Sequence, residues 1–170
     1  MTPIIETERL YLYHFKLQDT NFIIELLNTD GWLKNIGDRN IRTTEEAKEY
    51  LVNGPIKSYT ENGFGLSKVV LKNSLQPIGM CGLIKREGKK DIDLGFALMP
   101  LYEKQGYAYE IAQSVIAYGK KDFKLNKIVA FTLPENKSSI NLLEKLNFNF
   151  EVNFIENNET LSLYHLHLNK

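Results

Sequence analysis

The sequence contains only one cysteine, and this scarcity excludes several classes of protein. Cys81 has no partner within the chain, so an internal disulfide cannot form. Three scattered histidines and one cysteine give no cluster with the spacing of a metal site. We therefore expect a metal-free protein of a reducing compartment such as the cytoplasm. Cys81 itself fits a small buried apolar residue better than a nucleophile.

The sequence also lacks an excess of one charge and a long apolar run. Its 21 Lys and Arg residues balance its 21 Asp and Glu residues, so no overall field favours nucleic acid or an anionic membrane. Glu6, Glu8 and Arg9 interrupt residues 1–10, which therefore do not resemble a signal peptide, and no run approaches the length of a membrane span. We expect neither nucleic acid nor a membrane as a partner.

Hydrophobic residues make up 43% of the 170-residue chain, which is the composition and size of one domain with its own core. Gly and Pro stand singly between periodic segments, and the sequence shows no repeat or low-complexity tract. We expect residues 1–170 to form a single domain.

The spacing of apolar residues predicts an α+β chain. Alternating or β-rich segments predict strands over residues 9–15, 64–71, 77–85, 91–98, 128–133, 150–155 and 161–168. Helical spacing predicts helices that begin at Asp19 or Thr20, run from Thr44 to about Val52, and cover residues 108–119 and 140–147. We expect Gly54-Pro55 to interrupt the second helix. The helix over residues 108–119 joins two strands, which implies a parallel crossover.

The segment from Asp93 to Glu110 carries the clearest chemical signal, because a strand leads through a short loop into a helix. Free backbone N–H groups and the helix dipole can hold an anion at such a helix start. The small residues Gly106 and Ala108 would let phosphate oxygens reach the backbone, so a diphosphate would fit there. Taken alone, these two residues are better explained by a tight turn and close packing.

Several motifs together resemble the GNAT superfamily, and within it the RimJ/RimL-like acetyltransferases, over nearly the whole chain. The segment Glu103-Lys-Gln-Gly-Tyr-Ala108 is similar to the family's phosphate-binding signature, which is Arg or Gln, two variable residues, Gly, one variable residue, and Gly or Ala. Pro134-Glu-Asn-Lys-Ser-Ser139 and the following Leu143-Glu-Lys-Leu-Asn-Phe148 resemble a second family segment. Further matches are Ile5-Glu-Thr-Glu-Arg-Leu10, Ile36-Gly-Asp-Arg39 and Gly79-Met-Cys-Gly-Leu83.

The resemblance implies a fold and an activity. The fold would be the GNAT acyl-CoA N-acyltransferase fold, a mixed and mostly antiparallel twisted sheet of six or seven strands flanked by about four helices. The activity would be direct acetyl transfer from acetyl-CoA to a primary amine in a ternary complex. The acceptor would be a protein N-terminal α-amine or a small-molecule amine, and the enzyme a monomer or a homodimer. The alternative is a catalytically weak acetyl-CoA-binding sensor or interaction module.

The resemblance also implies roles for individual residues. Leu98 would offer its backbone amide to the oxyanion, Ser139 would assist the leaving sulfur, and Asp93 would accept the amine proton through water. Ser139 could instead satisfy local backbone groups, and Asp93 could be a solvated carboxylate. The cofactor-binding residues would be Phe96, Ala97, Leu98, Met99, Lys104, Gln105, Gly106, Tyr107, Ala108, Tyr109, Asn136 and Ser139.

The chain departs from the family pattern at two functional positions. Glu103 stands where Arg or Gln is usual, which predicts weaker binding of a diphosphate, and Leu143 replaces a proton-donating Tyr. Five further residues could face the acceptor amine or line the same cleft; these are Trp32, Asp38, Arg39, Tyr164 and His165. The alternation of His165 and His167 also fits one face of the last strand.

Overall fold

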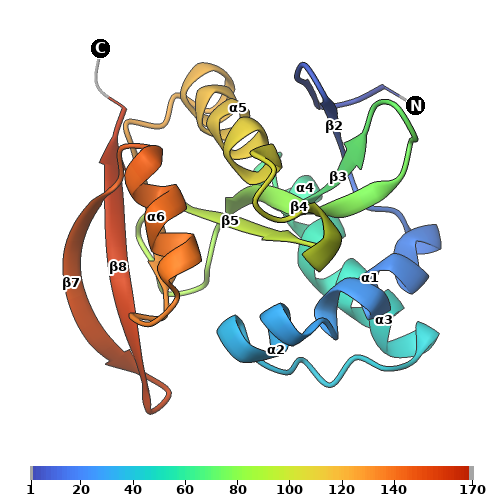
Figure 1. Cartoon of the computed structure of the whole chain (residues 1–170), viewed down its shortest axis with the longest axis horizontal. Coiled ribbons are helices and arrows are strands. Elements are labelled where there is room, and N and C mark those ends of the chain that lie inside the picture. The colour runs from blue at the N-terminus through green and yellow to red at the C-terminus, as the bar shows by residue number, and fades with distance from the viewer. Residues whose placement is uncertain (1, 169–170) are drawn as a thin grey trace.

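The computed structural model describes residues 2–168 and shows one mixed sheet with the strand order β1-β2-β3-β4-β5-β6-β8-β7 (Figure 1). The strands are β1 (Ile5–Glu6), β2 (Leu10–Tyr13), β3 (Ser67–Leu71), β4 (Pro77–Ile84), β5 (Asp93–Leu98), β6 (Lys127–Thr132), β7 (Asn149–Glu156) and β8 (Glu159–His167). Only β5 and β6 pair in parallel. The count of eight exceeds the six or seven expected, because β1 has two residues and is too short to show alternation.

Six α-helices occur in the described part of the chain, two more than the sequence pattern predicted. They are α1 (Thr20–Leu27), α2 (Asp30–Asn35), α3 (Thr44–Leu51), α4 (Lys57–Asn62), α5 (Tyr107–Asp122) and α6 (Lys137–Lys145). Helix α2 lies where a loop was expected. Its six residues span less than two turns, and the Thr29 side chain caps it by accepting a hydrogen bond from the Trp32 amide.

The α-helix that begins at Thr44 ends at Leu51, before Gly54-Pro55 as predicted, but the helical path does not stop there. A π-helical segment, Val52–Ile56, carries the chain from α3 directly into α4. Pro55 has no N–H to donate and would clash with the carbonyl four residues earlier in an α-helix. The wider π turn accommodates it, and the helical path continues to Asn62.

Two hydrophobic clusters hold the sheet. One joins α5 and α6 to the strands through Ile111, Val115 and Leu143, and the other joins α1 and α3 to them through Ile23 and Leu51. Figure 1 shows α5 and α6 near each other on one side of the sheet, with α1, α2 and α3 grouped elsewhere.

Strand β5 contributes to both clusters. Leu94, Phe96 and Leu98 face the cluster of α5 and α6, whereas Ala97 and Met99 face the cluster of α1 and α3. The expected alternation along this strand is therefore confirmed. Between residues 2 and 168, no helix is both long enough and apolar enough to cross a membrane.

Candidate active site

The sheet opens between β5 and β6. Their pairing consists of the residues Asp93 and Val129, and the rest of β5 is not paired with β6; Figure 1 shows β5 at the middle of the sheet. By contrast, β5 is paired with β4 along its whole length, from Asp93 with Ile84 to Leu98 with Gly79. The edge of β5 that faces β4 is therefore fully paired. The edge that faces β6 has no partner strand beyond Asp93.

The backbone groups of Phe96 and Leu98 point toward this open edge. The Met99 amide donates to the Ile78 carbonyl of β4 at 2.8 Å. Because successive N–H groups of a strand point to opposite edges, the amides of Leu98 and Phe96 point away from β4 and toward β6. The Val129 amide, which donates to the Ile92 carbonyl at 3.0 Å, marks the last place where β6 supplies a partner.

A second set of unpaired amides lies at the start of α5. Gly106 is the N-cap and has φ +84°, and Lys104 is also left-handed at φ +58°. The N–H groups of residues 104–109 form no hydrogen bond with any acceptor in residues 2–168. The two left-handed residues turn the chain sharply, so these amides gather at one helix end, where the helix dipole adds partial positive charge.

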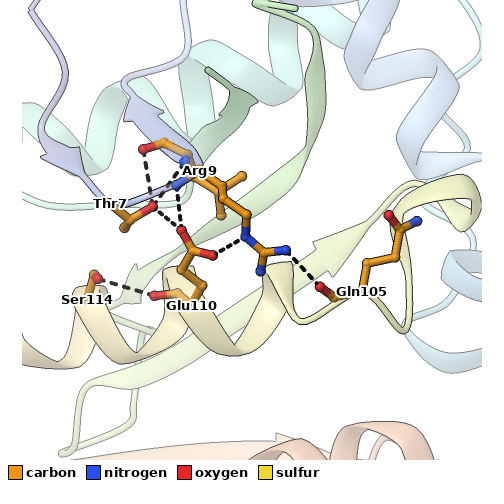
Figure 2. A network of polar contacts seen from close by, with 6 residues as sticks. Thr7, Arg9, Gln105, Glu110 and Ser114 are labelled. Carbon is orange, nitrogen blue, oxygen red and sulfur yellow. Dashed lines mark hydrogen bonds and ion pairs between the residues drawn. The ribbon is translucent and has the colours of Figure 1, made fainter. Parts of the chain in front are cut away.

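A polar network connects this helix start to the segment that precedes β2, as Figure 2 shows. The Glu110 carboxylate, in the first turn of α5, accepts hydrogen bonds from Thr7 Oγ1 at 2.6 Å and from Arg9 N and Nε at 2.8 and 2.7 Å. Arg9 Nη1 donates to the Gln105 carbonyl at 3.1 Å, and the guanidinium lies 4.3 Å above the Tyr107 ring. The segment before β2 is thus tied to the loop that precedes α5.

The network also determines how Glu110 ionises. Burial by itself raises the pKa of the Glu110 carboxyl, but the hydrogen bonds from Thr7 and Arg9 outweigh burial and hold that pKa below its ordinary value. The sequence motifs contained both partners, at Arg9 and Glu110, yet gave no sign that they touch. A single sequence carries no signal for a contact between residues that lie 101 positions apart.

The start of α6 lies just after β6. The Asn136 side chain accepts a hydrogen bond from the Ser139 amide at 3.2 Å, which confirms Asn136 as the N-cap. Ser139 is half-buried in the first turn of this helix. Leu143 is fully buried in the core, so this position offers packing and no proton.

Asp93 is buried and paired with Arg86. Its side chain is 2% exposed, and its two oxygens accept hydrogen bonds from Arg86 Nε and Nη2, both at 3.0 Å. Burial raises the pKa of the Asp93 carboxyl, and Arg86 opposes that rise in part. The solvated carboxylate considered from the sequence is therefore wrong, because Asp93 is buried in an ion pair with Arg86, while its role as a base stays a prediction.

Several residues considered for the acceptor side have other surroundings. Trp32 and Tyr164 are buried in the two hydrophobic clusters, so their rings are core groups. Asp38 pairs with Arg42 in an exposed ion pair. His165 lies on the same face of β8 as His167, and its Nδ1 is 3.1 Å from a carboxylate oxygen of Glu151 on the neighbouring strand β7.

Glu103 and Cys81 can also be placed. A Glu103 carboxylate oxygen lies 3.8 Å from where a side chain at Gly31 of α2 would begin, so this carboxylate reaches toward α2. Cys81 is fully buried, and burial raises the pKa of its thiol to about 12, which confirms that it is a core residue. Across the described residues, His, Cys, Asp and Glu side chains nowhere gather in a group of three that could hold a metal ion.

A mixed sheet that opens between two parallel strands, with unpaired amides at the next helix start, suits a ligand that carries both amide groups and an anionic group. The family model described as the Acetyltransferase (GNAT) domain matches residues 9–149. The chain belongs to this GNAT family and is an acetyltransferase.

Curated and solved relatives agree with this assignment. The uncharacterized N-acetyltransferase YnaD of Bacillus subtilis is 30% identical over 84% of this chain and 80% of its own length. A GNAT-family acetyltransferase from Bacillus anthracis is 27% identical, with a TM-score of 0.79 over 96% of this chain and 97% of its own. The ribosomal L7/L12 α-N-protein acetyltransferase RimL, solved with coenzyme A, shares the fold at a TM-score of 0.81 and 15% identity over 98% of each chain.

Proposed function

We propose that this enzyme transfers the acetyl group of acetyl-CoA directly to a primary amine in a ternary complex, within one acetyltransferase domain. The observation that carries the proposal is the open edge of β5 beside the unpaired amides of residues 104–109. The two sets of donors suit two parts of one ligand, an amide-bearing pantetheine arm and a diphosphate. Neither set requires a metal ion.

The diphosphate is assigned to the start of α5. Gly106 adopts the left-handed backbone of the N-cap at no steric cost, so the chain can turn the neighbouring amides toward phosphate oxygens. The amides of Gln105, Gly106, Tyr107 and Ala108 supply donors, and Lys104 supplies a positive charge beside them. The Glu103 carboxylate, which reaches toward α2, takes its negative charge away from these amides.

The acetyl thioester is assigned to the open edge of β5. In the reaction, the amine nitrogen attacks the thioester carbon, the carbon–sulfur bond breaks, the amine loses one proton and the leaving sulfur gains one. The amide of Leu98 is proposed to donate to the oxygen that becomes negative in the transition state. This role uses the main chain, so it is compatible with a Leu98 side chain that packs in the core.

Ser139 is proposed to donate a hydrogen bond to the leaving sulfur. Its amide is already held by the Asn136 side chain, whereas its hydroxyl makes no hydrogen bond with the other described residues. A serine hydroxyl is a weak acid, so its contribution is mainly stabilisation of the thiolate. Because Asp93 is closed by Arg86, we propose that the acceptor arrives as a neutral amine and that water takes its proton.

The acceptor proposed first is the α-amine of a protein N-terminus. The shared fold with RimL, whose described substrate is a ribosomal protein α-amine, supports this choice over a small-molecule amine. The test incubates the purified protein with acetyl-CoA and a panel of peptides and small amines, and follows release of free thiol. Calorimetry with CoA is run in parallel. Failure of both CoA and acetyl-CoA to bind would refute the proposal, whereas thiol release with one amine class would identify the acceptor.

A further inference from the structure

The loop before α5 is shaped by a residue from the other end of the chain. Arg9 lies against three consecutive residues where this loop enters α5, namely Gln105, Gly106 and Tyr107. Its Nη1 donates to the Gln105 carbonyl, its guanidinium covers the Tyr107 ring, and its Nη2 lies 3.2 Å from where a side chain at Gly106 would begin. Figure 2 shows the guanidinium reaching along the helix start toward Gln105.

The contact with the Gln105 carbonyl fixes the direction of an amide. The peptide bond between Gln105 and Gly106 is trans and planar, so its carbonyl and its N–H point in opposite directions. Because Arg9 holds the carbonyl on its own side, the Gly106 N–H points away from Arg9, to the side that is free for an anion. Without Arg9, this peptide plane could rotate and present its carbonyl oxygen to the anion.

Arg9 also controls a negative charge. Glu110 lies one turn into α5, where a free carboxylate would repel a diphosphate and compete for the helix amides. Its two oxygens instead face Thr7 and Arg9, and the Arg9 guanidinium balances its charge. The Glu110 side chain is 19% exposed, so solvent screens that charge poorly once its partner is removed.

We infer that Arg9 is a positioning residue for the diphosphate of the cofactor, which it serves without touching it. It holds the Gln105–Gly106 peptide so that an amide faces the ligand, and it neutralises Glu110 beneath the same loop. In this chain Glu103 occupies the motif position where the family uses Arg or Gln, and Arg9 adds a positive charge from a distant segment to that of Lys104 in the loop. The inference rests on the proposed function.

The decisive comparison is Arg9→Met with Arg9→Met/Glu110→Gln. Arg9→Met keeps most of the side chain's apolar length but removes its charge and its donors. We expect the Kd for CoA to rise by about tenfold, the loss of roughly 1.4 kcal/mol. Turnover of acetyl-pantetheine, which lacks the diphosphate, should stay at the wild-type rate. In the double variant the unpaired carboxylate is gone, so the Kd for CoA should be about threefold lower than in Arg9→Met.

Two further variants make the result specific. Lys72→Met removes the ion pair between Lys72 and Glu6, which also ties the first strands together but does not touch α5, so CoA affinity should not change. Arg9→Lys keeps the charge but cannot donate from Nε and Nη1 together, so its loss should lie between those of wild type and Arg9→Met. Arg9→Lys also serves if Arg9→Met does not fold.

Three results would overturn the inference: wild-type CoA affinity in the Arg9 variants, an equal loss with acetyl-pantetheine, or no recovery in the double variant. The second and third would mean that Arg9 only anchors the N-terminal strands to α5. These failures are seen in a protein whose wild type binds CoA. Failure of the proposed function is distinct, because there the wild type itself does not bind.

Discussion

Replacement of Gly106 by Ala tests the diphosphate site directly. A left-handed residue with a Cβ is less stable than glycine by about 1–2 kcal/mol, and Gly106 has φ +84°. The new Cβ would also lie 3.2 Å from Arg9 Nη2, so the guanidinium must give way by a few tenths of an ångström. Both effects push the loop to rotate its amides away from the ligand. We expect the Kd for CoA to rise by about tenfold, or ~1.4 kcal/mol, when measured by calorimetry.

Gly88→Ala is the matched control. Gly88 also has a left-handed backbone, at φ +73°, and a side chain there would meet no atom within 4 Å. Both variants should therefore lose a similar free energy of unfolding in urea, but only Gly106→Ala should lose CoA affinity. The reasoning is refuted if Gly106→Ala binds CoA as tightly as the wild type, or if Gly88→Ala weakens binding equally.

Three other outcomes are expected. Leu98→Pro removes an N–H that β4 does not use, so kcat should fall by about 10²–10³ while CoA affinity changes little; Leu98→Ala keeps the N–H and should retain most of kcat. Ser139→Ala should lower kcat about tenfold at unchanged CoA affinity, and the control variant Ser138→Ala should behave as wild type. A wild-type kcat in Ser139→Ala would remove the role proposed for Ser139. Because the pKa of Glu110 is lowered in the fold, its stabilisation is present above the unfolded value of 4.5 and is lost as pH falls below it. Urea unfolding of Glu110→Gln should therefore depend less on pH in that acidic range than wild type does.

Local patterns were sufficient to predict much of this fold. The apolar stripe that includes Ile111 and Val115 predicted α5, and the strands on either side of it made the parallel crossover predictable. Such a stripe can be recognised in the sequence because one face of the helix packs on the sheet over about four turns. Helix α2 and strand β1 are too short to form a stripe or an alternation, so the sequence did not reveal them.

The site was predictable only where it is local. The loop through Gly106 and the cap at Asn136 are contiguous segments, and their motifs placed them on the expected elements. Asp93 forms an ion pair with Arg86, and the two side chains meet only because β4 and β5 form a hairpin. The contacts of Arg9 depend on residues still further along the chain, because its partners belong to α5 and to the loop before it. Side-chain pairing between elements follows from tertiary packing, which periodicity does not record.

The short pairing of β5 with β6 links catalysis to folding. A pantetheine arm seated along that edge would act as a missing strand, and its amides would complete hydrogen bonds that the polypeptide leaves open. Substrate concentration would then set the resistance of the enzyme to heat and proteolysis, with a gain of about 2.7 kcal/mol at 100 times the Kd. Hydrogen exchange at the Phe96 and Leu98 amides would slow as the substrate concentration rises. The exchange rates of these two amides would therefore measure the fraction of enzyme with substrate bound.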